Sequence, residues 1–145
     1  MLNLKRYRIC AIGKVRKKWV REGVAQYQKR LPNLAVTELR DSTLQRESQS
    51  ILNELKIDEV LVAVTEEGEL LSSPALAERL NSFGSQRLVF AIGGADGLAP
   101  KIKTSAFWQI SLSKLTFPHE IARLLLLEQL YRAHSIIKGS PYHRN

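Results

Sequence analysis

The sequence has 145 residues and contains little of what several enzyme classes need. Its single cysteine, Cys10, stands in an apolar run and cannot form a disulfide within the chain. No pair of cysteines and no close group of histidines has the spacing of metal ligands, and no Gly-x-Ser-x-Gly sequence marks a nucleophilic serine. These absences leave hydrolase and metalloenzyme functions without support, and we expect no bound metal.

Long apolar runs are also missing. No segment approaches the ~20 apolar residues that a membrane helix needs, and no apolar stretch follows the basic residues at the N-terminus as it does in a signal peptide. Together with the lone cysteine, these features predict a cytoplasmic protein with no membrane partner. Hydrophobic residues make up 44% of the chain, enough for one buried core, and we expect a single domain over residues 1–145.

Basic residues outnumber acidic ones by 22 to 14, which gives a formal net charge of +8. A surplus of this size on a small domain indicates a polyanionic partner, whose binding should weaken steeply with salt. The basic residues gather near the C-terminus and, above all, in the first thirty residues: Lys5, Arg6, Arg8, Lys14, Arg16, Lys17, Lys18, Arg21, Lys29 and Arg30. The pattern predicts one basic side that binds nucleic acid, although a solvated helix face gives the same counts.

Apolar patterning predicts strands that alternate with helices. Strands are expected at 7–12, 35–39, 59–64, 87–92 and 108–112, and helices at 15–31, 42–55, 73–83, 100–106 and 120–138. The alternation is typical of an α/β fold with a largely parallel sheet flanked by helices. Such sheets bind ligands beyond the carboxyl ends of their strands, so the loops after Val64, Ile92 and Leu112 are the places to look for a site.

Several local features refine this prediction. The first helix has one apolar face, formed by Val15, Trp19, Val24, Tyr27 and Leu31. Gly23 costs that helix about 1 kcal/mol against alanine, which suggests a close approach by another element. Ser73 is the expected N-cap before Pro74, and Gly139 with Pro141 is expected to end the last helix. Three acidic residues are expected to form a turn: Glu66, Glu67 and Glu69.

The first candidate motif is Ile92-Gly93-Gly94-Ala95-Asp96-Gly97-Leu98, which directly follows a buried strand. Three glycines in five residues let the backbone turn sharply and come close to a ligand. The spacing matches neither the dinucleotide fingerprint nor the phosphate-binding P-loop. A tight turn without a ligand explains the motif equally well.

The second candidate motif links the last strand to the last helix: Leu112-Ser113-Lys114-Leu115-Thr116-Phe117-Pro118-His119. Thr116 as N-cap and Pro118 in the first turn would give two of these residues a purely structural role. Leu115 and Phe117 need another explanation, because apolar side chains in a loop indicate burial or a ligand. A lone histidine such as His119 is more often structural than catalytic.

The third candidate motif is the C-terminal tail, in which Tyr142, His143 and Arg144 follow Pro141. These residues offer an aromatic ring for stacking, a titratable imidazole and a fixed cation. The alternative is a frayed basic tail, since chain ends are often poorly ordered.

Taken in order, these segments resemble the RlmH family of SPOUT methyltransferases. The resemblance is carried by IGGADGL after a strand, by LSKLTFPH, by EQLYRAHSI in the long helix and by the terminal PYHR. The N-terminal GKVRKKWVREGVAQYQKRL is also similar to the first helix of that family. The likeness covers nearly the whole chain and is strongest over residues 92–144. Ala95-Asp96 stands where other members often carry Pro-Glu.

This resemblance implies methylation of N3 of a pseudouridine in large-subunit (23S) ribosomal RNA, with S-adenosylmethionine as methyl donor. It implies a SPOUT-type fold whose C-terminal part forms a deep trefoil knot, and a homodimer that acts on the ribosome or its RNA. The cofactor would sit in the knot, held mostly by backbone groups. By position, the cofactor-contacting residues would be Val64, Gly93, Leu112, Ser113, Lys114, Leu115, Thr116 and Phe117.

On this reading the tail is catalytic. His143 would act as general base or proton relay, Arg144 would stabilise negative charge on the substrate base, and Tyr142 would position that base. In the dimer, the tail can serve the cofactor site of the partner. The basic first helix would hold RNA phosphates through Lys14, Lys17 and Arg21.

Three other readings remain open on the sequence. One is an RNA-binding or ribosome-assembly protein without catalytic activity, which the charge fits equally well. Another is the same chemistry on a transfer RNA. The third is a flavodoxin-like nucleotide-binding protein, which the lack of a phosphate loop disfavours.

Overall fold

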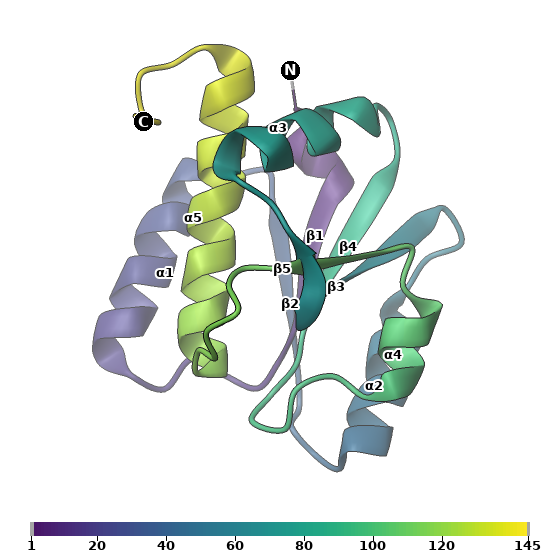
Figure 1. Cartoon of the computed structure of the whole chain (residues 1–145). Coiled ribbons are helices and arrows are strands. Elements are labelled where there is room, and N and C mark those ends of the chain that lie inside the picture. The colour runs from purple at the N-terminus through teal and green to yellow at the C-terminus, as the bar shows by residue number, and fades with distance from the viewer. Residues whose placement is uncertain (1, 145) are drawn as a thin grey trace.

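A five-stranded parallel sheet forms the centre of the molecule. The computed structural model describes residues 2–144 and gives the strand order β2-β1-β4-β3-β5, with every pair of neighbours parallel (Figure 1). The strands are β1 (Tyr7–Ile12), β2 (Ala35–Leu39), β3 (Glu59–Leu70), β4 (Arg87–Ile92) and β5 (Trp108–Ser111). The predicted α/β class and parallel sheet are thus confirmed.

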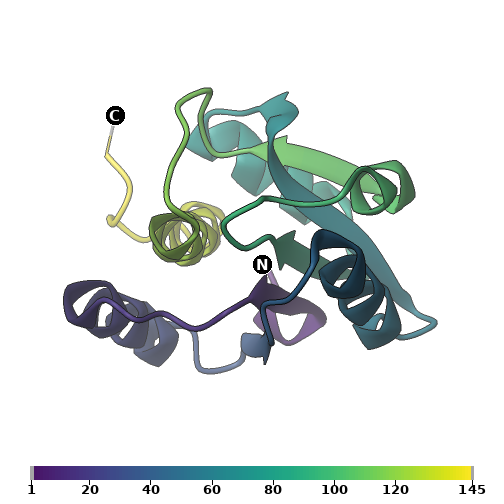
Figure 2. The same ribbon diagram turned by 90° about the horizontal axis from the view of Figure 1, so that it is seen from below.

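Helices cover both faces of the sheet. They are α1 (Lys18–Arg30), α2 (Leu44–Glu54), α3 (Ser73–Ser82), α4 (Pro100–Ser105) and α5 (His119–Lys138), and a short 3-10 helix precedes β1 at Leu4–Arg6. Helices α1, α3 and α5 share one apolar core with side chains such as Ile9 and Phe90, while α2 and α4 share the other with Cys10 and Val89. Figure 2 shows these two helical layers on either side of the sheet. The central strands are therefore buried on both faces, as their near-continuous apolar sequences predict.

Helices α1 and α5 pack closely against each other. A Cβ atom on Gly23 would lie 3.2 Å from both Cδ atoms of Leu124, so the predicted close approach is confirmed. The predicted apolar face was partly wrong. Helix α1 begins at Lys18, which leaves Val15 in the preceding loop, and Trp19 is 60% exposed while its neighbour Val20 is fully buried.

Strand β3 is longer than predicted, and the three acidic residues form no turn. Glu66, Glu67 and Glu69 continue the strand to Leu70, with a shift of register against β5 between Val64 and Glu69. Gly68 makes this possible, because a Cβ atom there would lie 2.5 Å from the carbonyl carbon of Ile110. The indole N–H of Trp108 donates to the Glu69 carboxylate over 3.0 Å, which also ties the extension to β5.

Two predicted helix caps were wrong. Helix α3 is capped by Ser72, whose hydroxyl accepts from the N–H of Ala75, so Ser73 is already helical. Thr116 caps nothing, because the chain stays non-helical through Pro118 and α5 begins at His119. Gly139, with φ of 81°, ends α5 as predicted. In the part of the chain that the structure describes, no helix is both long and apolar enough to cross a membrane.

Candidate active site

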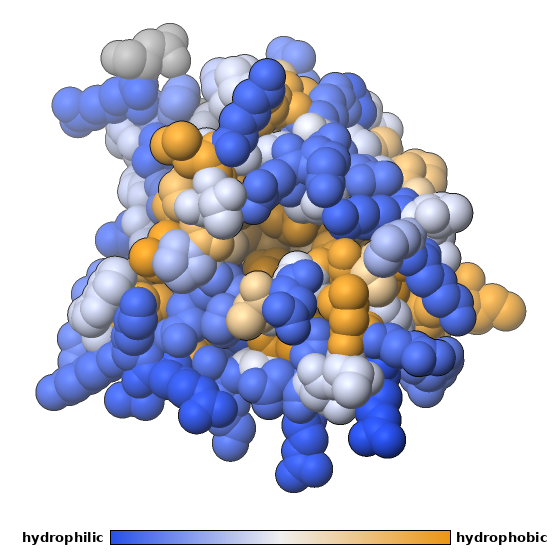
Figure 3. All heavy atoms as spheres, turned by 60° about the horizontal axis from the view of Figure 1, so that its bottom comes forward, coloured by the Kyte–Doolittle hydropathy of each residue, from blue (hydrophilic) through white to orange (hydrophobic). Residues whose placement is uncertain are grey.

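A cavity of about 770 Å³ opens beside the middle of β3, at the carboxyl ends of β4 and β5. Residues 64–67 of β3, the loops that follow β4 and β5, and the first turn of α5 line it. Figure 3 shows the face of the molecule toward which these strand ends point, and apolar atoms line the hollow at its centre. We call it the glycine-turn cavity, after residues 93–97 in its wall. Its position is the one predicted for a ligand site in a parallel sheet.

The glycine turn is a reverse turn closed by a hydrogen bond from the N–H of Gly97 to the carbonyl of Gly94, 3.0 Å long. Gly97 has φ of 72°, a conformation that favours glycine. Gly93 is required for a different reason, since a Cβ atom there would collide with the carbonyl group of Gly97. The turn therefore presents bare backbone to the cavity.

The loop after β5 is organised by two serine hydroxyls. Ser111 donates its hydroxyl hydrogen to the carbonyl of Ser113 over 2.9 Å, and the Ser113 hydroxyl accepts from the N–H of Leu115 over 3.0 Å. Leu115 stays 71% exposed, although it is an apolar side chain. The loop thus holds an apolar side chain at the cavity without burying it.

The structure brings most of the predicted cofactor-contacting residues together. Seven of the eight line the cavity: Val64, Gly93, Leu112, Ser113, Leu115, Thr116 and Phe117. Lys114 does not line it. Contact of these residues with a cofactor stays a prediction.

Sequence reasoning missed the acidic part of the lining. Because β3 runs on past Val64, Glu66 and Glu67 reach the cavity, where Asp96 of the glycine turn joins them. Hydrogen bonds from the Thr65 hydroxyl and from Lys103 lower the pKa of Glu67 to about 2. The cavity also takes in His119, for which the sequence favoured a structural role.

The C-terminal tail folds back on α1 and α5. The Tyr142 hydroxyl donates to the Glu128 carboxylate over 2.9 Å and lies 2.8 Å from the Tyr27 hydroxyl, and burial is the main cause that raises its pKa. Nδ1 of His143 lies 3.1 Å from a guanidinium nitrogen of Arg132. The frayed-tail alternative is therefore wrong for Tyr142 and His143, whereas Arg144 is exposed.

The tail does not reach the cavity of its own chain. His119 at the start of α5 lines the cavity, whereas the tail follows the last residue of the helix, Lys138, and folds back (Figure 1). Tyr142 contacts Glu128, nine residues after His119, and no described residue of the tail lines the cavity. Within one chain, the predicted catalytic residues Tyr142, His143 and Arg144 are therefore not brought to the predicted cofactor-contacting residues. Among the described residues, no group of three or more His, Cys, Asp and Glu side chains is placed to hold a metal ion.

Comparison with known proteins gives the family. A family model described as "Predicted SPOUT methyltransferase" matches residues 5–143. A "Ribosomal RNA large subunit methyltransferase H" from Prochlorococcus marinus (strain MIT 9211) is 60% identical over 145 residues, which is the full length of both chains. A protein of the same name from Synechococcus sp. (strain CC9311) is 57% identical over 143 residues, or 99% of each chain.

A solved structure shares the fold. It is that of a probable methylase family protein from Haemophilus influenzae Rd KW20, with a TM-score of 0.62 and 12% identity, over 99% of this chain and 72% of that one. The family match spans nearly the whole chain, including the glycine turn, the loop after β5 and most of the tail. The protein therefore belongs to the SPOUT methyltransferase family.

Proposed function

We propose that the protein methylates N3 of a pseudouridine in large-subunit ribosomal RNA and works as a homodimer in the cytoplasm, where ribosomes are assembled. The methyl donor of this family is S-adenosylmethionine. The convergence of two strand-end loops and the middle of β3 on one cavity is the observation that carries the proposal. The names of the full-length relatives support ribosomal RNA as the substrate.

The glycine-turn cavity fits S-adenosylmethionine in size and chemistry. Its volume of about 770 Å³ is within the range of small-molecule sites. The cofactor carries positive charge on its sulfonium and ammonium groups, and the carboxylates of Glu66 and Asp96 complement it, whereas Glu67 is already paired with Lys103 of the same lining. Leu115 and Phe117 offer apolar surface to the adenine ring, and the bare backbone of the glycine turn offers hydrogen-bonding groups.

When bound, the cofactor supplies an activated methyl group on sulfur, so the protein has to position and deprotonate the acceptor. The N3–H of pseudouridine is a weak acid, and its loss spreads negative charge onto the flanking carbonyl oxygens. His143 takes the proton as general base or relay, and Arg144 stabilises the charge that develops. Tyr142 positions the base by stacking.

The proposed dimer accounts for the separation of the tail from the cavity. Because no described residue of the tail lines the cavity of its own chain, the tail of one subunit serves the cavity of the other. A deep trefoil knot in the C-terminal part, which would shape the cofactor site, belongs to the same proposal. Each active site is then composed of two chains.

The test is calorimetric titration with S-adenosylmethionine, followed by methyl transfer to ribosomes and to isolated large subunits. We expect micromolar binding and incorporation of one methyl group at a pseudouridine, located by mass spectrometry of the digested RNA. No binding at millimolar cofactor, with and without ribosomes, would contradict the proposal and favour an RNA-binding assembly factor.

A truncated protein separates the two halves of the site. Removal of the residues after Ser140 deletes the proposed base and cation but leaves every residue that lines the cavity. We expect cofactor binding to be unchanged and methyl transfer to be lost. Full activity of the truncated protein would show that the tail has no catalytic role.

A further inference from the structure

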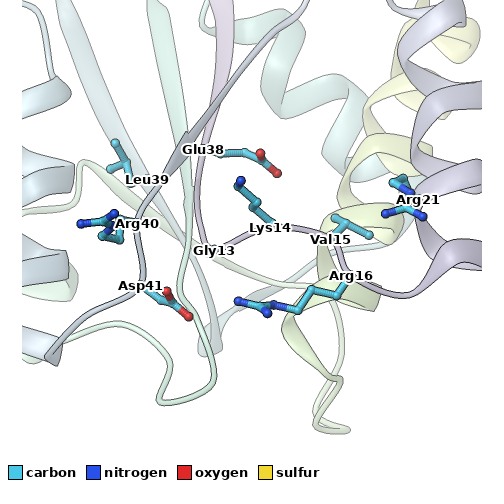
Figure 4. Close-up of a pocket in the computed structure, with 9 residues that line it drawn as sticks. All are labelled: Gly13, Lys14, Val15, Arg16, Arg21, Glu38, Leu39, Arg40 and Asp41. Carbon is cyan, nitrogen blue, oxygen red and sulfur yellow. The ribbon is translucent and has the colours of Figure 1, made fainter.

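A second cavity, of about 700 Å³, lies at the carboxyl ends of β1 and β2. Four basic residues from three segments line it: Lys14 and Arg16 after β1, Arg21 in α1, and Arg40 after β2. Figure 4 shows Arg16 extending toward Asp41, with Arg40 and Arg21 on opposite sides of them. We call it the basic cavity.

The two loops that form the basic cavity are fixed by buried carboxylates. Glu120, 8% exposed, accepts from the backbone N–H groups of Arg16 and Lys17 over 2.9 and 3.1 Å. Glu47, 6% exposed, accepts from the N–H of Ser42 over 2.8 Å, directly after Asp41. A cavity whose backbone is held in this way is preorganised for a ligand.

The charged side chains of the basic cavity suit an anionic ligand. Lys14, Arg16, Arg21 and Arg40 are exposed, and within residues 2–144 none of the four forms an ion pair. Of the two carboxylates that line the basic cavity, Glu38 is already compensated by an ion pair with the buried Arg123. Four unpaired cations therefore face one uncompensated carboxylate, that of Asp41.

The basic cavity lies beside the glycine-turn cavity. Gly13 lines the former and His119 the latter, and a Cβ atom on Gly13 would lie 4.0 Å from Nε2 of His119. Arg123, one turn after His119 on α5, donates to the carbonyl of Gly13 over 2.8 Å. A strand of nucleic acid whose target base enters the glycine-turn cavity can reach the basic cavity within one or two nucleotides.

We infer that the basic cavity binds the phosphates of the RNA strand next to the nucleotide that is methylated. Guanidinium groups pair with phosphate oxygens through two parallel hydrogen bonds, and three of the four basic side chains are arginines. The inference rests on the proposed function, and it assigns the contact with the strand to these four residues. Binding by these four residues differs from general attraction of RNA to a basic surface, because loss of basic residues at other positions should not weaken it to the same extent.

The test compares two double variants that each lose two positive charges. Arg16→Ala with Arg40→Ala removes one cation from each side of the basic cavity. Lys29→Ala with Lys101→Ala is the control, since both lysines are exposed on helices outside the two cavities. Fluorescence anisotropy with a labelled twelve-nucleotide single-stranded RNA, over a range of salt concentrations, measures the dissociation constant.

For the cavity variant we expect a dissociation constant raised roughly tenfold or more, because two charge-assisted contacts are lost. The slope of log binding constant against log salt should fall by about 0.7 for each phosphate contact removed. The KM for ribosomal substrate should rise with little change in kcat, and the control should change each quantity much less.

Equal losses in the two variants would overturn the inference in favour of a general surface effect. Unchanged RNA binding in the cavity variant would overturn it outright, and equal affinity for a twelve-residue polyglutamate would assign the cavity to an acidic protein partner. Calorimetry with S-adenosylmethionine keeps the proposals distinguishable. RNA binding that depends on Arg16 and Arg40, in a protein that binds no cofactor, would refute the methyltransferase proposal and leave the basic cavity as an RNA-phosphate site with no methylated nucleotide beside it.

Discussion

At the scale of single residues, Leu115 gives the most direct test of the glycine-turn cavity. Its side chain is 71% exposed at the cavity, so it contributes little to the free energy of folding. A ligand that covers it would gain binding free energy from burying its apolar surface. We expect Leu115→Ala to weaken S-adenosylmethionine binding about tenfold without lowering the melting temperature. Calorimetry and thermal unfolding measure the two effects.

A matched control is Ile57→Ala, because Ile57 is also an exposed apolar residue but lies outside both cavities. It should change neither quantity. A Leu115 variant that binds the cofactor as tightly as the parent protein would remove this side chain from the cofactor site.

Cys10 is expected to be unreactive in the folded protein. Its thiol is fully buried, and burial raises its pKa to about 11, so almost no thiolate is present near neutral pH. We expect no alkylation by iodoacetamide at pH 8 in buffer and complete alkylation in guanidinium chloride, as measured by mass spectrometry. Alkylation of the native protein at the rate of a free thiol would contradict the burial of this strand.

At the scale of secondary-structure elements, the contact between β3 and β5 helps to position the residues that line the glycine-turn cavity. Gly68 does not line the cavity, yet its Cα lies where a methyl group would collide with the backbone of Ile110. We expect Gly68→Ala to displace β5 and the loop that follows it, and so to weaken cofactor binding. The free energy of unfolding should fall by about 1–3 kcal/mol, as for other overpacked sites.

Gly23→Ala is the matched control for Gly68→Ala. The added methyl group would meet only the flexible end of Leu124, 3.2 Å away, and alanine favours the helix. Denaturant unfolding should show a small change in either direction, and cofactor binding should be preserved. Similar losses of cofactor binding in both variants would mean that the β3–β5 contact has no special role.

The elements themselves could mostly be predicted from the sequence, for a physical reason. Buried parallel strands are continuous apolar runs, so β1 and β4 have the predicted bounds. The bounds of β2 were also predicted, although it is a partly exposed edge strand. The end of β3 could not be predicted, because polar residues 66–69 become a strand only through contact with β5. The prediction of the buried face of α1 was wrong for a similar reason. Whether Trp19 or its neighbour Val20 faces the core depends on where the helix begins.

At the scale of the whole molecule, the topology rule for parallel sheets explains why much of the candidate site was predictable. The loops after β4 and β5 lie at the same edge of the sheet, and Gly93 and Phe117 from these loops line one cavity together with Val64 of β3. The position of the tail was not predictable, because no pattern in the sequence tells where a segment after a long helix folds back. The basic cavity could be predicted only in part from the sequence, because Arg40 lies far along the chain from the other basic residues that line it.

An active site composed of two chains predicts complementation between inactive variants. His143→Ala removes the proposed base, and Leu115→Asp places a charge in the proposed adenine subsite. After the two proteins are mixed, unfolded and refolded together, half of the dimers contain both chains, and each of these has one intact site. We expect about a quarter of the parental methyl-transfer activity, although each variant alone is inactive.

Two outcomes would contradict the shared site. If the mixture stays inactive while sedimentation shows that mixed dimers form, the tail serves its own chain. If the parent protein sediments as a monomer at concentrations where it is active, no partner is needed.

The acidic lining of the glycine-turn cavity has a consequence for turnover. Methyl transfer converts the sulfonium of the cofactor into a neutral thioether, so the spent cofactor carries one positive charge fewer than the donor. On the proposed function, the unpaired carboxylates Glu66 and Asp96 stabilise the donor and attract the product less strongly. The same carboxylates that favour loading of the cavity therefore favour its clearance, and we expect only weak product inhibition.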